Sequence, residues 1–167
     1  MIMAKYVLEK LLDIRKKRED ELTQQLAKAR SDLQRAEEQC EEKKRNLDDF
    51  VAEMPEKKAR LYATVMNNVV KRETLDKLKE ALADLERQRL VLAEQLEKAR
   101  QNVAQARQTL EQTQKNLLLA TKNTMKLDNH KDAWMEEEKR IETENAEKEL
   151  EDLHSKISPV GDDDDSL

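Results

Sequence analysis

Few side chains in this sequence are of the types that carry chemistry, and their spacing assembles no catalytic site. The two histidines, His130 and His154, lie too far apart on one predicted helix to share a site. Glu151 and His154 have the Glu-x-x-His spacing of half a carboxylate di-iron site, which also needs a second copy and two more glutamates on facing helices. Glutamate is frequent here, so we interpret this pair as coincidence. We therefore predict no catalytic residue, no metal, no cofactor and no enzyme activity.

Other functional classes are excluded by composition. Cys40 is the only cysteine, and its place among apolar residues predicts a small core side chain rather than a reactive thiol. A lone cysteine also fits a reducing compartment. The chain has one glycine, too few for a phosphate-binding loop. A net charge of −5 with 2% aromatic residues argues against nucleic-acid binding.

The composition instead predicts a few very long helices. Charged residues make up 41% of the 167 residues, with one glycine and two prolines, so a layered core with many turns is excluded. The longest apolar run has four residues, so we expect no membrane insertion. Lys5, Glu9 and Lys10 interrupt any signal-peptide core, and we expect the chain to stay in the cytoplasm.

The central element is the stretch 75–141, which carries an apolar seam with a period of 3.5 residues. Such a period sustained over many heptads is typical of a coiled-coil helix. The seam positions are Leu75, Leu78, Leu82, Leu85, Arg89, Leu92, Leu96, Ala99, Val103, Ala106, Leu110, Thr113, Leu117, Ala120, Thr124, Leu127, Lys131, Trp134, Glu138 and Ile141.

A second seam with the same period runs through residues 5–54. Pro55 follows it directly and predicts that the first arm kinks or ends there. Residues 55–74 would form the tip, with the reversal at Asn67-Asn68, because Asn tolerates the left-handed conformation. The seam positions are Leu8, Leu12, Arg15, Glu19, Leu22, Leu26, Ala29, Leu33, Ala36, Cys40, Lys43, Leu47, Phe50 and Met54.

Two matching seams in one chain predict an all-α fold, a long two-helix antiparallel coiled-coil hairpin that occupies residues 1–157 as a single domain. Arm 1 would span about 5–54 and arm 2 about 75–157. In the preferred register Ala29 faces Val103 and Ala36 faces Leu96, so that large residues mostly meet small ones. This register leaves a C-terminal helical overhang from Asn129 to about Ile157.

A rival register removes the overhang by setting the basic residues 15–18 against Glu136–Glu138 and Glu142. The rival register buries fewer leucine side chains than the preferred one. A buried leucine contributes more to stability (~1.5–3 kcal/mol) than an exposed charge pair (~0.2–1 kcal/mol). Past Ile141 the seam shifts by one residue to Ala146, Leu150, Leu153 and Ile157. We expect residues 158–167, with Asp162–Asp165, to be a disordered acidic tail.

Trp134 is the strongest candidate for a binding residue. It would either close the end of the hairpin core or anchor a partner, since tryptophan is enriched at interface hot spots. The basic run Arg15, Lys16, Lys17 and Arg18 is either a solvated helix face or a contact patch. An unpaired amphipathic overhang favours a docking surface.

Two blocks of sequence resemble a known family. The opening Tyr6-Val7-Leu8-Glu9-Lys10-Leu11-Leu12-Asp13-Ile14-Arg15-Lys16-Lys17-Arg18 and the later His130-Lys131-Asp132-Ala133-Trp134-Met135-Glu136-Glu137 are similar to the YscO/FliJ-like stalk proteins of type III secretion, in particular the chlamydial-type members. The His-Lys-x-x-Trp block carries most of the resemblance, because its residues are rare in coiled coils. The acidic tail is not part of the family pattern.

The resemblance implies a non-enzymatic central stalk, located in the cytoplasm beside the inner-membrane secretion apparatus. Such a stalk links the hexameric secretion ATPase to the cytoplasmic ring of the export gate and binds export chaperones. On this analogy the contact end would hold Tyr6, Arg15, Lys16, Lys17, Arg18, His130, Lys131 and Trp134, and the chain would be a monomer. Two alternatives stay open: a holdase-like chaperone escort and a homodimeric coiled-coil spacer.

Overall fold

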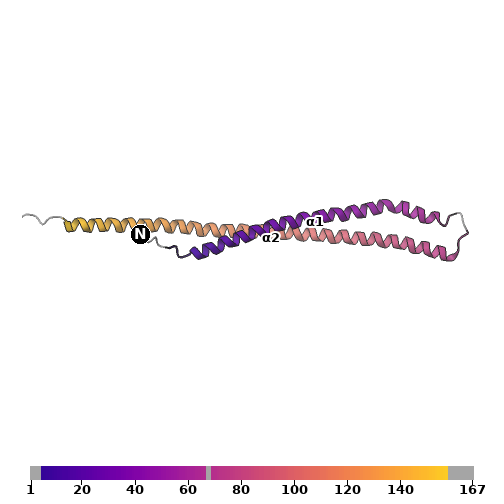
Figure 1. Cartoon of the computed structure of the whole chain (residues 1–167), viewed down its shortest axis with the longest axis horizontal. Helices are drawn as coiled ribbons and strands as arrows, with labels where there is room; N and C mark the ends of the chain where they lie inside the picture. Colours follow the sequence, from indigo (N-terminus) through magenta and orange to yellow (C-terminus); the bar gives the residue numbers. More distant parts are fainter. Residues whose placement is uncertain (1–4, 67–68, 158–167) are drawn as a thin grey trace, which may run out of the picture. The chain divides into compact units, whose positions relative to one another are not determined.

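Two long helices make up nearly all of the structure, a computed structural model that describes residues 5–66 and 69–157 (Figure 1). Helix α1 spans Glu9–Ala63 and helix α2 spans Arg72–Ile157. Within those described ranges there is no β-strand. The predicted all-α helical hairpin is therefore confirmed.

The helix ends follow from local chemistry. Both helices begin with an acidic residue in the first turn, Glu9 in α1 and Glu73 in α2. The negative side chain interacts favourably with the positive end of the helix dipole. Helix α1 ends where the Thr64 hydroxyl donates to the Leu61 carbonyl, 2.7 Å away. This side-chain bond satisfies one of the carbonyls that a helix end leaves without a partner.

Helix α1 does not end at Pro55, where the sequence allowed it to end, but continues to Ala63. A proline inside a helix removes one backbone hydrogen bond and costs roughly 3 kcal/mol. Packing offsets this cost, because the neighbouring Met54 is buried and Lys58 pairs with Glu86 of α2. The break between the helices is therefore shorter than the predicted tip at 55–74. The predicted reversal at Asn67-Asn68 lies outside the described residues, as does the acidic tail.

The chain forms two compact units, each built from one segment of each helix. Unit 1 combines residues up to Asp20 with those from Leu118 onward, and unit 2 comprises Glu21–Leu117. The helices of unit 2 run antiparallel: Glu37 pairs with Arg107 at 3.2 Å, and Lys58, later in α1, pairs with Glu86, earlier in α2.

The predicted seams form the core of each unit. Every predicted seam residue from Leu8 to Met54 and from Leu78 to Glu138 is buried or half-buried, including the polar positions. Thr113 and Thr124 are accommodated because their hydroxyls donate to the carbonyls of Thr109 and Ala120, one turn earlier in the same helix. The most buried apolar side chains are Tyr6, Leu12, Leu22, Ala29, Met54, Leu96, Ala99 and Leu127.

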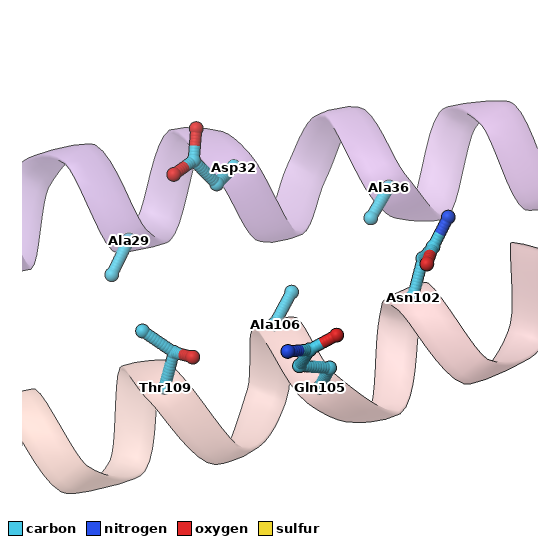
Figure 2. Close-up of a pocket in the computed structure, with 7 residues that line it drawn as sticks. All are labelled: Ala29, Asp32, Ala36, Asn102, Gln105, Ala106 and Thr109. Carbon is cyan, nitrogen blue, oxygen red and sulfur yellow. The ribbon is translucent and has the colours of Figure 1, made fainter.

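The register in unit 2 differs from the predicted one. Ala29 lies across from Thr109 rather than Val103, and Ala36 lies near Asn102 rather than Leu96 (Figure 2). The difference is about one heptad, or two helical turns. A shift of one heptad returns every seam residue to a seam position, so the periodicity that located the seams could not choose between the two registers.

Small side chains line a hollow of about 290 Å³ at this level of unit 2. Figure 2 shows Ala29 and Ala36 on α1 and Ala106 on α2 projecting into the space between the helices. Asp32, Asn102 and Gln105 border the same hollow. Its polar side chains are ordinary flanking residues of a coiled coil and form no recognisable site.

Candidate protein-binding site

An aromatic cluster joins the N-terminus to α2 in unit 1. The Tyr6 hydroxyl lies 2.6 Å from His130 Nδ1, and the Tyr6 ring centroid lies 5.3 Å from that of Trp134. His130 and Trp134 are four residues apart and so share one face of α2. Tyr6 is only 5% exposed, although it precedes the first helix. We call Tyr6, Glu9, His130, Lys131 and Trp134 the aromatic cluster.

A partly buried ion pair completes the aromatic cluster. Lys131 Nζ lies 2.8 Å from Glu9 Oε2, and both side chains are about one-third exposed. The hydrogen bond to Glu9 raises the pKa of Lys131, and the nearby Asp128 and Asp13 carboxylates add to the effect. Lys131 therefore occupies a seam position as a charged, paired residue.

These contacts correct the predicted start of the overhang. The seam was expected to lose its partner from Asn129 onward, yet Lys131 and Trp134 both contact the N-terminal segment of the same chain. The register shift explains part of the error, because moving the pairing by about one heptad brings two more turns of α2 into contact with the N-terminal segment. Trp134 is half-buried beside Tyr6, a position that is compatible both with closing the core and with anchoring a partner.

The structure divides the predicted basic patch. Arg15 lies on the seam and donates to the Asn123 carbonyl at 2.8 Å, and Lys16 pairs with Asp128 at 3.8 Å. Lys17 and Arg18 are exposed. The Arg15 contact also argues against the rival register, which set these residues against glutamates 136–142. Arg15 and Lys16 thus help to hold unit 1 together.

Beyond the aromatic cluster, α2 continues as a solvent-exposed helix. Every residue from Ile141 to Ile157 is exposed and helical. An overhang therefore exists, but it begins about twelve residues later than predicted. Its apolar residues include Leu150, Leu153 and Ile157, with 64%, 54% and 74% of their surface exposed.

A groove of about 230 Å³ lies where the aromatic cluster meets this exposed helix. Tyr6, Trp134 and Met135 provide its apolar surface. Met135 and Glu138 were not predicted as binding residues, although Glu138, four residues after Trp134, lies on the same helix face. The full lining is Tyr6, Glu9, Lys131, Trp134, Met135, Glu138, Lys139 and Glu142.

The residues considered above for catalysis or metal binding lie apart in the described chain. Cys40 is half-buried on the seam of unit 2, and Glu151 and His154 lie on the exposed part of α2. Among the described residues, no three histidine, cysteine or carboxylate side chains gather as a metal site would require. Within the same ranges, neither helix holds a stretch apolar and long enough to span a membrane.

Comparison with known proteins identifies relatives. Residues 8–156 match the family model described as type III secretion protein YscO. The solved structure of YscO from Vibrio parahaemolyticus is similar with a TM-score of 0.83 and 22% identity, covering 87% of this chain and 91% of that one. A proposed YscO homologue from Chlamydia trachomatis has a TM-score of 0.70 and 25% identity, covering 93% and 100%. A comparison with curated protein sequences finds no match.

Proposed function

Because the chain belongs to the YscO family of type III secretion proteins, we propose that it is a non-enzymatic central stalk or adaptor of the secretion apparatus. In this role it links the hexameric secretion ATPase to the export gate in the cytoplasm and binds export chaperones. Family membership supports a role in type III secretion. The finer assignment depends on the surfaces that the fold leaves exposed.

The observation that carries the proposal is the fully exposed end of α2. A helix with few neighbours is marginal in water unless an amphipathic face is buried, and every residue from 141 to 157 is exposed. Leu150, Leu153 and Ile157 are spaced to lie on one side of that helix. Such a face next to a groove with a half-buried tryptophan is what a docking surface requires.

ATP hydrolysis by the cognate secretion ATPase, measured with and without this protein, tests the proposal. We expect the protein to raise the hydrolysis rate or promote hexamer formation. A variant with Leu150→Gln and Leu153→Gln should lose this effect, whereas Leu118→Gln with Leu119→Gln, which changes two exposed leucines elsewhere on α2, should keep it. The proposal would be contradicted if the wild-type protein changed neither the hydrolysis rate nor the hexamer formation of the ATPase.

One observation favours a second role as an escort for client chains or chaperones. Several large apolar side chains outside the seams are exposed, among them Ile14, Leu118 and Met125, at 62%, 58% and 58%. A pull-down with unfolded substrates or client-free export chaperones, without the ATPase, separates this role from the stalk. The seams themselves pack within each unit, so the homodimeric spacer gains no support from the structure.

A further inference from the structure

We propose that the groove beside the aromatic cluster and the exposed apolar strip of α2 together bind a single basic amphipathic helix of a partner protein. The strip consists of Met135, Ala146, Leu150, Leu153 and Ile157. This inference rests on the proposed function in that it names the class of partner at this end of the protein. Its experiment contains no ATPase, so it can fail separately.

The groove and the strip lie on one line along α2. Met135, in the groove, and Leu153, in the strip, are eighteen residues apart. This separation corresponds to five complete turns at about 3.6 residues per turn, so the two side chains point in the same direction. Ala146 and Ile157 fall within about 40° of that direction, and Leu150 within about 60°. The apolar residues of the strip therefore lie on one side of α2, and Lys139 and Glu142 occupy the same side between Met135 and Ala146.

The strip is separate from the surface that unit 1 already uses. Trp134 and Glu138 occupy seam positions and are half-buried against the N-terminal segment. Met135, one residue after Trp134, is rotated from it by about 100°. At its groove end the strip thus has Tyr6 and Trp134 beside it, and farther along it is open to solvent.

Acidic side chains border the strip. Glu138, Glu142 and Glu149 lie along one edge, at the spacing i, i+4 and i+11. No ion pair involving these three occurs in the parts of the chain that the structure describes. On another face of the helix, Glu137 and Glu144 both pair with Arg140. The acidic charge beside the strip is therefore available to a partner, whereas that on the Arg140 face is partly neutralised.

The charge of the whole segment selects the class of partner. Residues 132–157 contain ten acidic and four basic residues, a net charge of −6. An anionic membrane surface and an acidic helix would both be repelled. A helix with lysine or arginine beside an apolar face would pair with the glutamates, and an arginine could stack on the ring of Trp134 or Tyr6.

Synthetic peptides provide the probe. We would titrate the full chain with an 18-residue tryptophan-free helix that has leucine along one face and lysine and arginine beside it. Two matched peptides carry the same leucines with glutamate flanks, or the basic composition scrambled around the helix. Because Trp134 is the chain's only tryptophan, its fluorescence reports groove occupancy. We expect a spectral shift with the first peptide alone, and weaker binding as salt is raised.

Matched variants locate the site. Glu138→Gln with Glu142→Gln and Glu149→Gln should weaken binding of the basic peptide roughly tenfold, since each exposed charge pair contributes only modestly and three are removed together. Glu137→Gln with Glu144→Gln and Glu151→Gln removes the same total charge away from the strip and should leave binding unchanged. Circular dichroism of both variants checks that α2 stays helical.

Specific results would overturn the inference. Equal binding of the acidic or scrambled peptide would show that neither charge nor pattern is recognised, and equal weakening by both triple variants would show only general attraction. A dimer in sedimentation equilibrium that Leu150→Gln with Leu153→Gln abolishes would identify a second copy as the occupant. If the wild-type chain does not bind the basic peptide but still stimulates the ATPase, this inference is refuted and the stalk function remains supported.

Discussion

The packing of unit 2 and the packing of the aromatic cluster in unit 1 differ in kind. In unit 2 the seam repeats leucine and small residues, so that Ala29, Ala36 and Ala106 lie around one hollow. In unit 1 the pairing ends on one tyrosine, one histidine, one tryptophan and a lysine–glutamate pair. The first pattern recurs every heptad, and the second occurs once in the chain.

The difference separates two tasks that one coiled coil has to perform. Repeated apolar layers supply most of the buried area, and they do so nearly equally well after a slip of one heptad. Contacts that occur once exist in a single register only, so they specify which register is adopted. We therefore expect stability to come mainly from the repeated seam, and register specificity from the contacts that occur once, among them the aromatic cluster and the ion pairs between the helices.

Cysteine cross-linking gives the largest expected difference. In a Cys40→Ser background, Ala29→Cys with Thr109→Cys should form a cross-link nearly completely, whereas Ala29→Cys with Val103→Cys should form little, because a disulfide needs Cα atoms within about 7 Å. Adding Tyr6→Ala and Trp134→Ala should make the second pair reactive. Gel electrophoresis under non-reducing conditions measures both. If the added substitutions change nothing, the aromatic cluster does not set the register.

Truncating a seam leucine should have the next largest effect. Leu12, in unit 1, is 1% exposed and Leu22, in unit 2, is 2% exposed. Leu→Ala at either position should lower the free energy of unfolding by about 2–4 kcal/mol, through lost burial and the remaining cavity. Urea denaturation followed by circular dichroism measures the loss. A much smaller cost at Leu22 would contradict the view that the repeated seam carries the stability.

The aromatic contact should be worth less than a seam leucine. A double-mutant cycle with Tyr6→Ala and Trp134→Ala should give a coupling energy of about 0.5–1.5 kcal/mol, the range for aromatic pairs. Tyr6→Phe, which keeps the ring and removes the hydroxyl near His130, should retain most of the coupling. Additive single effects would mean that the two rings do not interact in solution.

The Lys131–Glu9 pair should give the smallest effect, visible as a dependence on pH. The pKa of Lys131 is raised above its ordinary 10.5 in the folded state, first by the hydrogen bond to Glu9. A raised folded-state pKa contributes stability below the unfolded value, and the contribution is lost as pH rises through the folded value. The stability difference between wild type and Lys131→Met should thus be constant from about pH 7 to 9.5 and shrink above about 10.5. A difference that persists undiminished would exclude the ion pair as its source.

Sequence periodicity alone predicted the helices and the buried faces. Each seam residue from Leu78 to Glu138 lies where it was expected, because burial of one helix face depends on local spacing only. The register was predicted wrongly because the match of large and small residues survives a heptad shift. The continuation of α1 through Pro55 depends on tertiary packing around Met54, which local propensity does not contain.

The candidate site was predicted in part. Trp134, His130, Lys131 and Tyr6 were singled out for their rarity or by resemblance, and the structure brings them together. The groove with Met135 and Glu138 could not be predicted without knowing which part of α2 the N-terminal segment contacts. That contact depends on the register. Arg15 was assigned either to a solvated helix face or to a contact patch, and the structure shows that its side chain reaches a backbone carbonyl of α2.

The contact between Tyr6 and His130 has a consequence for biosynthesis. The two residues are separated by 124 positions, so the tyrosine leaves the ribosome well before its partner has been made. Long-range contacts form late because the loop between them must first be closed. We therefore expect the nascent hairpin to begin pairing its repeated layers before this register-specific contact can form.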